Sequence, residues 1–430
     1  MDMKKFAIIS PSPIKGSGGV ARIFNFASAL ALAGYKTDVY VFDYASKNSN
    51  QIACQALEFY GASGFEVICG SSLCGEYDFA MATRWDTAIF VRDSSAKHKL
   101  YLVQDFEACF NPVGDATIFA ENSYMYGLQP ITYGRWLATK LSVEYGCSPY
   151  YLNFSSELDR FFVKRPYSER MEERPSVCFI YQSDKPRRCP QLGIEALGIV
   201  KNIRPDVDIY LVGSDEAPKL WFEYKNVGLL NLEGLNELYN NCHVGLCLSS
   251  SNPSCNPFDM MAAGLPSVEL YRENNLYDLP EESVLLAHQT PESIAEALVY
   301  LLNNPEQRRK MSEFGVNFMC SRSAKEEVNQ FLSIISEIDL GGTGNQISLD
   351  NLPQKYTASA VVAAACQNQA VQGHVKAQFN TFKSTEAIDT KGGLTYSFGL
   401  VRKRSAQRLY SVKNYRLPQL MKLILRRLGF

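Results

Sequence analysis

A chain of 430 residues with 46% hydrophobic content is long enough for two ordinary domains and too long for a single hydrophobic core. Its formal net charge of -2 does not fit a dedicated nucleic-acid-binding protein, so we expect no nucleic-acid partner. No apolar run in the sequence reaches the ~18 residues that a membrane-spanning helix needs.

The chain begins with MDMKKFAIIS, which runs directly into an expected core strand and carries no secretory signal. Its 12 cysteines are scattered, without a CxxC pair or a histidine at metal-ligand spacing. This usage is typical of small core residues in a reducing compartment. We therefore expect a cytoplasmic protein, and we expect no metal and no bound cofactor.

Short apolar runs alternate with helical patterns through the first part of the chain. A strand is expected at residues 4–10, a helix at 20–35 and a second strand at 36–43, with Gly34 as the helix stop. This β–loop–α–β opening predicts a parallel, doubly wound sheet. The later elements expected in this part are strands at 65–69, 87–91 and 100–105, and a strand-to-helix step at 130–141.

A charged, proline-bearing passage at 163–175 is typical of an interdomain linker, and a second α/β series follows it. Strands are expected at 176–182, 207–213 and 243–250, and helices at 191–203, 235–242, 290–304, 305–319 and 323–338. Thr290 is a plausible N-cap. We therefore expect an α/β fold with two doubly wound, Rossmann-like domains facing a cleft, an N-terminal one at 1–165 and a C-terminal one at 175–340.

The character of the sequence changes after residue 340. Residues 341–400 show no sustained period, and we expect a linker or a loosely ordered segment. Residues 401–430 are basic, with Leu420, Leu423, Ile424 and Leu428 at helical spacing beside Lys422, Arg426 and Arg427. This pattern is typical of an amphipathic helix that touches anionic lipid on the inner face of the plasma membrane. Docking onto its own domain or onto a partner protein is the alternative.

The first candidate site is the glycine-rich loop SPSPIKGSGGVARIF between the first strand and the first helix. Gly16, Gly18 and Gly19 could bring backbone N–H groups to a phosphate or to sugar hydroxyls. The pattern also meets G-x-G-x-x-A through Ala21, with Asp43 after the next strand as a ribose-binding acid would be. Because six residues separate strand and glycines, the tight turn of a dinucleotide site is disfavoured. A structural glycine loop remains a second alternative to a ligand-facing one.

The second candidate is YLVQDFEACFNP, in which Asp105 and Glu107 follow a strand. Open α/β sheets bind ligands at the carboxyl ends of their strands. These acids could therefore face the cleft, where they are the candidate catalytic residues. The alternative is a solvated loop with ordinary acids.

The third candidate is YQSDKPRRCPQLGIEAL, in which Lys185, Arg187 and Arg188 stand between a strand and a helix. Three cations beside a helix N-terminus could neutralise a diphosphate. The alternative is a solvated basic face.

The fourth candidate is SNPSCNPFDMMAAGLPSVE, residues 251–269, in which a turn-rich loop leads to an acid, Asp259, in the first turn of a helix. One carboxylate can accept both vicinal hydroxyls of a ribose. The alternative is an acid that only complements the helix dipole, worth ~0.3–1 kcal/mol.

Taken together, these stretches resemble the GT-B glycosyltransferases of the GT4 type (glycosyl transferase group 1). More narrowly, they resemble the WsaF-type rhamnosyltransferases of bacterial surface-polysaccharide assembly. The resemblance is carried by YLVQDFEACFNP, AENSYMYGLQPITYGRWLATKL, the P-R-R…LGIEAL segment and LSSSNPSCNPFDMMAAGLPSVE, and it covers most of residues 1–340.

The resemblance implies a role for each candidate residue. Asp259 stands at the second acid of the E-x7-E donor signature and would bind the donor ribose, whereas Ser251 replaces the first acid. The loop that holds Ser251, Cys255 and Asn256 would face the donor sugar. The residues matching the diphosphate-binding positions are Lys185, Arg187, Gly18 and Gly19. Asp105 and Glu107 occupy the loop in which the family usually has a histidine.

The activity implied by the resemblance is a metal-independent, retaining transfer of a sugar, with rhamnose from dTDP-rhamnose as the expected donor. The acceptor would be a growing or lipid-linked glycan, and the nucleotide sugar would be a co-substrate rather than a cofactor. Two alternatives stay open at this point. One is an NAD-dependent dehydrogenase, and the other is a catalytically silent sugar-binding or assembly protein, which the serine at 251 allows.

Overall fold

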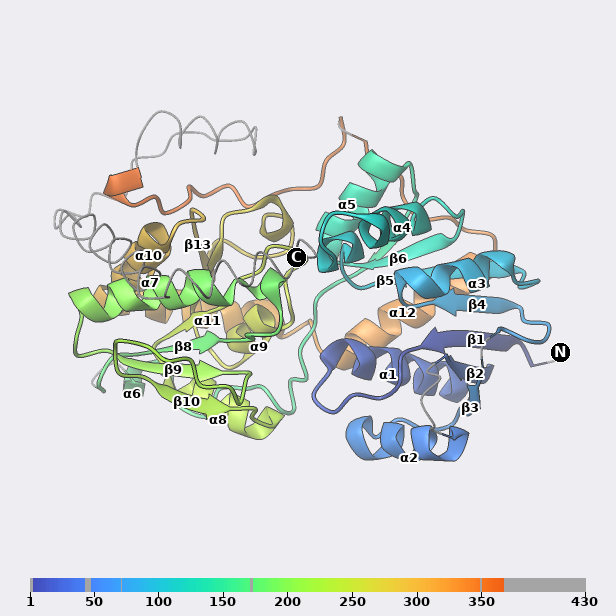
Figure 1. Ribbon diagram of the computed structural model, residues 1–430, viewed down its shortest axis with the longest axis horizontal. Coiled ribbons are helices and arrows are strands. Elements are labelled where there is room, and N and C mark those ends of the chain that lie inside the picture. Colours follow the sequence, from blue (N-terminus) through green and yellow to red (C-terminus); the bar gives the residue numbers. More distant parts are fainter. Residues whose placement is uncertain (1–2, 43–47, 71, 171–172, 349, 367–430) are drawn as a thin grey trace, which may run out of the picture.

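The computed structural model describes residues 3–42, 48–70, 72–170, 173–348 and 350–366. In this part of the chain the strands form two parallel sheets that lie side by side, each with helices on both faces (Figure 1). No helix within it is long and apolar enough to cross a membrane. The α/β fold class and the two doubly wound units expected from the sequence are confirmed.

Seven of the described strands form the N-terminal sheet, in the order β3-β2-β1-β4-β5-β6-β7. All neighbouring strands are parallel, so their carboxyl ends share one edge. The order reverses direction between β1 and β4, which is where doubly wound sheets open a crevice for ligands. The strands are β1 (Lys5–Ser10), β2 (Lys36–Val41), β3 (Glu66–Cys69), β4 (Phe79–Ala82), β5 (His98–Val103), β6 (Gln129–Tyr133) and β7 (Tyr150–Leu152).

Two helices of this half, α1 (Gly18–Leu32) and α5 (Gly134–Tyr145), lie where the sequence predicted them, and the others were not predicted. The others are α2 (Ser49–Tyr60), α3 (Ala88–Asp93) and α4 (Asp115–Ser123), with the short 3-10 helices η1 (Trp85–Thr87) and η2 (Glu107–Phe110). The strand expected at 87–91 is wrong, because this apolar run lies in η1 and α3. Its buried side chains, Ala88 and Val91, are three residues apart, while Ile89 is exposed, which is helical spacing.

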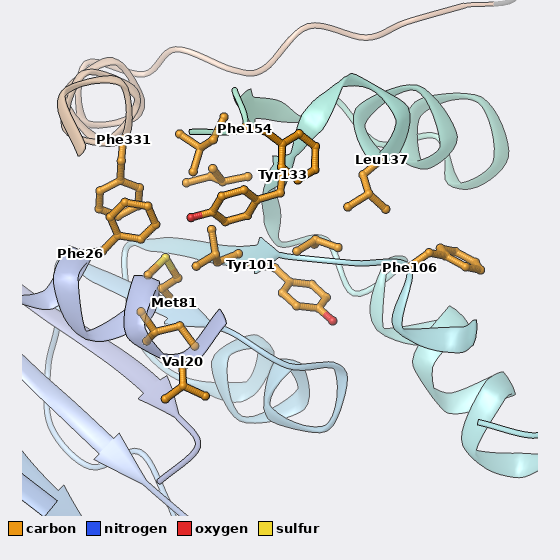
Figure 2. Close-up of a cluster of buried hydrophobic side chains, with 14 of the residues drawn as sticks. Val20, Phe26, Met81, Tyr101, Phe106, Tyr133, Leu137, Phe154 and Phe331 are labelled. Carbon is orange, nitrogen blue, oxygen red and sulfur yellow. The ribbon is translucent and has the colours of Figure 1, made fainter. Parts of the chain in front are cut away.

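The last long helix, α12 (Ala324–Asp339), packs on the N-terminal sheet although it follows the C-terminal domain in sequence. The rings of Phe26 on α1 and Phe331 on α12 stack with centroids 4.2 Å apart (Figure 2). Both rings are fully buried. The C-terminal domain expected at 175–340 includes α12 in chain order. By its contacts, however, α12 belongs to the N-terminal domain.

Six of the described strands form the C-terminal sheet, in the parallel order β10-β9-β8-β11-β12-β13. The strands are β8 (Ser176–Ile180), β9 (Asp208–Val212), β10 (Lys225–Gly228), β11 (Val244–Leu246), β12 (Ser267–Leu270) and β13 (Val284–Ala287). The helices are α6 (Tyr167–Arg170), α7 (Pro190–Ile203), α8 (Leu232–Asn241), α9 (Asn256–Ala262), α10 (Pro291–Asn303) and α11 (Pro305–Met319), with η3 (Pro186–Arg188), η4 (Glu273–Asn275) and η5 (Ala364–Cys366). Thr290 caps α10 by accepting a hydrogen bond from the amide of Ser293, as expected.

Residues 350–366 pack on the C-terminal domain, which differs from the loosely ordered segment expected there. Tyr356 is buried, and its hydroxyl donates to the carbonyl of Val284 at 3.0 Å. Val361 forms an isolated bridge with Ala287 at the end of β13. Residues 367–400 and the basic segment 401–430 lie outside the described residues, so the expectations for them stay predictions.

Candidate functional site

The two domains meet at the carboxyl ends of β5, β6 and β11. The loop after β11, residues 249–255 (the interdomain loop), carries the buried side chain of Asn252 to the N-terminal sheet. Its amide Nδ2 donates to the carbonyls of Gln104 and Tyr133, both at 3.0 Å. A loop of the C-terminal domain thus closes onto the ends of two N-terminal strands.

Asp105 lies at the centre of this junction. Its carboxylate accepts hydrogen bonds from the backbone N of Asn252 at 2.8 Å and from Oγ of Ser251 at 2.9 Å. Nε of Arg187 lies 3.8 Å from the same carboxylate. Burial raises the pKa of Asp105, and the nearby Arg188 and Arg187 oppose that rise. The structure therefore brings three of the predicted site residues together across the domain boundary.

Glu107 lies two residues further on but faces the interior of the N-terminal domain. Its Oε2 accepts from the backbone N of Trp85 at 2.7 Å, and its own N–H donates to the hydroxyl of Tyr124. Burial raises the pKa of Glu107 to about 8. This carboxyl group holds the start of η1, and it does not reach the interdomain loop through any of these bonds.

The three cations after β8 divide into two kinds. Arg188 is buried and committed to the interdomain loop, because its Nη1 donates to Oγ of Ser249 at 2.5 Å and to the carbonyl of Asn252. Arg187 stacks on the exposed ring of Phe110 at 4.3 Å, and its Nε is buried without a hydrogen-bond partner among the described residues. Lys185 is half-buried, and burial lowers its pKa. Arg187 and Lys185 are therefore the cations best able to take an anionic ligand.

The glycine loop reaches the same edge from the N-terminal side. Gly18 and Gly19 are exposed at the start of α1, where the Ser17 side chain caps the helix. Nε2 of Gln104 donates to the carbonyl of Gly19 at 3.0 Å, and a Cβ at Gly19 would lie 2.5 Å from Oε1 of that glutamine. A side chain at 19 would therefore displace the end of the Gln104 side chain. Asp43, the acid of the dinucleotide alternative, lies outside the described residues.

Asp259 occupies the first turn of α9, as expected, and is partly exposed. Its Oδ1 accepts from Oγ of Ser156, in the crossover between the domains, at 2.6 Å. Desolvation by the surrounding atoms raises the pKa of Asp259 to about 7, although Ser156 and Arg22 favour its charged form. Cys255 stands at the N-cap of the same helix, and Asn256 bonds locally to Oγ of Ser254.

Sequence reasoning missed the cluster around Arg22. Its Nη1 lies 3.2 Å from Oε2 of Glu327 on α12, whose other oxygen accepts from the hydroxyl of Tyr133 at 2.5 Å. Oγ of Ser155 also donates to Glu327. A signal was available, because Arg22 is the one charged residue within α1. The acid, by contrast, lies 305 positions away along the chain (327 minus 22), beyond any local pattern.

Two of the three cations after β8 lie close to the start of a helix. Lys185 and Arg187 precede the N-terminus of α7, where the helix dipole adds positive potential. No group of three or more His, Cys, Asp or Glu side chains within the described ranges is placed to hold a metal ion.

Three kinds of comparison bear on this chain. Residues 175–299 match the family model "WsaF, C-terminal domain". The O-antigen biosynthesis protein RfbC of Myxococcus xanthus is 26% identical over 328 residues, which cover 73% of this chain and 25% of RfbC. The chain thus spans about a quarter of the length of that relative.

Solved structures agree on the architecture. HepE of Anabaena, in complex with UDP and glucose, superposes with a TM-score of 0.56 at 12% identity over 78% of this chain and 99% of that one. WaaG, a glycosyltransferase involved in lipopolysaccharide biosynthesis, gives 0.55 at 12% identity over 79% and 100%. TarM gives 0.59 at 9% identity over 77% and 99%. These matches show that the fold is GT-B, and the family match supports the resemblance of the second domain to WsaF; the GT4 type and the donor sugar stay predictions.

Proposed function

We infer that this chain, which has a GT-B fold and a WsaF-type second domain, is a glycosyltransferase that moves a sugar from a nucleoside diphosphate to a growing surface polysaccharide. One observation carries the proposal: Lys185 and Arg187 stand beside the N-terminus of α7 at the domain junction, and Nε of Arg187 is buried without a hydrogen-bond partner among the described residues. The matched relative is named for O-antigen biosynthesis, and solved neighbours were obtained with UDP and with UDP-glucose.

The chemistry follows from these charges. In the transfer, the bond between the anomeric carbon and the diphosphate oxygen breaks, and the acceptor hydroxyl oxygen bonds to that carbon and releases its proton. The leaving diphosphate gains negative charge. Lys185, Arg187 and the N-terminus of α7 would stabilise this charge without a metal, which is electrostatic catalysis by preorganised groups.

The donor ribose would lie against Asp259. A carboxylate in the first turn of α9 can accept two vicinal hydroxyls, and Ser156 already donates one hydrogen bond to it. Gly18 and Gly19, at the N-terminus of α1, would approach the phosphates from the other domain. Cys255 and Asn256 would then border the transferred sugar, whereas Ser251 in the same loop is fully buried and donates to Asp105.

The finer assignments rest on the WsaF-type match of residues 175–299. They are rhamnose from dTDP-rhamnose as donor, retention of configuration, and an acceptor that is a lipid-linked glycan. Contact of residues 401–430 with the inner face of the plasma membrane is part of the same proposal, and a lipid-linked acceptor would suit it. None of these assignments requires a bound cofactor.

Calorimetric titration with dTDP and UDP tests the site. We expect Arg187→Ala to weaken the binding of the better nucleotide ~10-fold or more, because a charge-assisted hydrogen bond contributes about 1.5–3 kcal/mol. Asp259→Ala should weaken it as well, whereas Asp115→Asn, at an exposed acid of α4, should not. Unchanged affinity in both site variants would overturn the assignment. A thermal shift with NAD and none with either nucleotide would favour the dehydrogenase alternative.

A further inference from the structure

The carboxylate of Asp105, in the N-terminal domain, is held by two consecutive residues of the C-terminal domain. Oδ1 accepts from the backbone N of Asn252, and Oδ2 accepts from Oγ of Ser251. Asp105 follows β5, whereas the other two follow β11 in the second sheet. Ser251 is 0% exposed and Asn252 is 1% exposed, so these bonds are shielded from water.

The same loop is tied to the cations. The backbone N of Ser250 donates to the carbonyl of Arg187 at 2.9 Å, and Oγ of Ser250 donates to that carbonyl as well. Arg188 donates to the carbonyl of Asn252 at 3.2 Å. A displacement of the interdomain loop would therefore move the backbone of Arg187 and remove a partner of Arg188.

We propose that Asp105 is a positioning residue that docks the interdomain loop on the N-terminal domain and thereby sets Arg187 for the donor diphosphate. The part that concerns the donor rests on the proposed function, whereas the docking does not. The carboxylate of Asp105 also accepts a hydrogen bond from the backbone N of Phe106 at 2.8 Å. With three hydrogen bonds already on its two oxygens, the negative charge of Asp105 holds protein groups together rather than taking a proton from an acceptor.

A serine at position 251 is compatible with the buried carboxylate of Asp105. Its hydroxyl donates to Asp105 and leaves space for the carboxylate to reach the backbone N of Asn252. A carboxylate at 251 would place two negative charges in one buried space, where like charges disfavour each other's ionised form. The broad family pattern puts an acid at this position of the loop. In this chain the acid at the junction belongs to the other domain, and Ser251 and Asp105 form a matched pair.

Hydrogen exchange of the interdomain loop tests the docking without any donor. Asp105→Ala removes the acceptor of the Asn252 amide, so we expect the amides of residues 250–252 and of Ser254 to exchange at least ~10-fold faster. The amides of β8 should be unchanged. Ser251→Ala, which removes one bond only, should give a smaller increase, and Asp115→Asn should give none. If Asp105→Ala does not fold, Asp105→Asn, which keeps one acceptor oxygen and loses the charge, and Ser251→Ala should each still speed the exchange, by a smaller factor.

A charge exchange gives a second, independent readout. Ser251→Glu alone should speed loop exchange, and the double variant Ser251→Glu, Asp105→Ser should recover most of the protection, because one acid and one hydroxyl again face each other. If the double variant loses as much protection as Ser251→Glu alone, the result contradicts the matched pair.

Steady-state kinetics distinguish a positioning role of Asp105 from a proton-transfer role. They are measured with a sugar donor that the wild type uses. A positioning role predicts that Asp105→Asn raises KM for the donor several-fold and leaves the shape of the kcat–pH profile unchanged. Wild-type loop exchange in Asp105→Ala, or loss of the acidic limb of that profile in Asp105→Asn, would overturn the proposal. If the wild type turns over no donor but the loop is released in Asp105→Ala, the docking stands and the proposed function fails.

Discussion

Replacing Glu107 with glutamine should change how stability depends on pH. The carboxyl group is buried, with an ordinary pKa of 4.5 raised to about 8 in the folded chain. Between these values the folded state binds the proton and the unfolded state does not, so the free energy of unfolding falls as pH rises. For these two pKa values, the loss from pH 6 to pH 9 works out at about 2.5 kcal/mol. Glutamine keeps an acceptor oxygen for Trp85 and cannot ionise.

The assay is guanidinium denaturation at pH 6 and pH 9, followed by tryptophan fluorescence. We expect the wild type to lose about 2.5 kcal/mol more than Glu107→Gln between the two pH values. Glu58→Gln, at an exposed acid of α2, is the control and should follow the wild type. If the wild type and Glu107→Gln lose the same free energy of unfolding between pH 6 and pH 9, Glu107 does not hold a proton in the folded state.

Three further substitutions test the packing and the domain junction, all by chemical denaturation. Gly193→Ala places a Cβ 2.2 Å from a buried ring and should cost about 1–3 kcal/mol, whereas Gly198→Ala, in the same helix with its nearest atom at 3.3 Å, should cost less or stabilise. Asp278→Ala removes the acceptor of two backbone N–H groups at the start of α5 and should cost ~1–2 kcal/mol; no loss would exclude a capping role. Arg22→Ala leaves Glu327 buried without its cation and should cost about 3 kcal/mol or more, a larger loss than Arg22→Lys.

Local patterns in the sequence predicted much of the fold. Strand β1, helix α1 and strand β2 are found where the hydrophobic pattern placed them, because α1 buries one apolar face and each strand is a continuous buried run. Strand β4 was missed because its four residues are all apolar and buried, so this short run shows no period. The run at 87–91 is also short, and it was assigned to the wrong type of element.

The sequence could indicate which residues belong to the candidate site. It could not indicate which of them contact one another. Parallel-sheet geometry explains why Asp105 and Arg187 lie at carboxyl edges, which a sequence pattern can indicate. The bond between Asp105 and Ser251 joins positions 146 residues apart and depends on how two domains meet. The inward direction of Glu107 likewise follows from Trp85, in a segment whose structure was not foreseen.

Turnover of nucleotide sugars tests the central claim most directly. The measurement is release of nucleoside diphosphate from a panel of donors that includes dTDP-rhamnose and UDP-glucose, in buffer containing a chelator, by the wild type and by the Lys185→Ala, Arg187→Ala double variant. The account predicts release from at least one donor by the wild type, and loss of that release in the double variant, with Asp115→Asn unchanged. No release from any donor by the wild type, or equal release by the double variant, would contradict it.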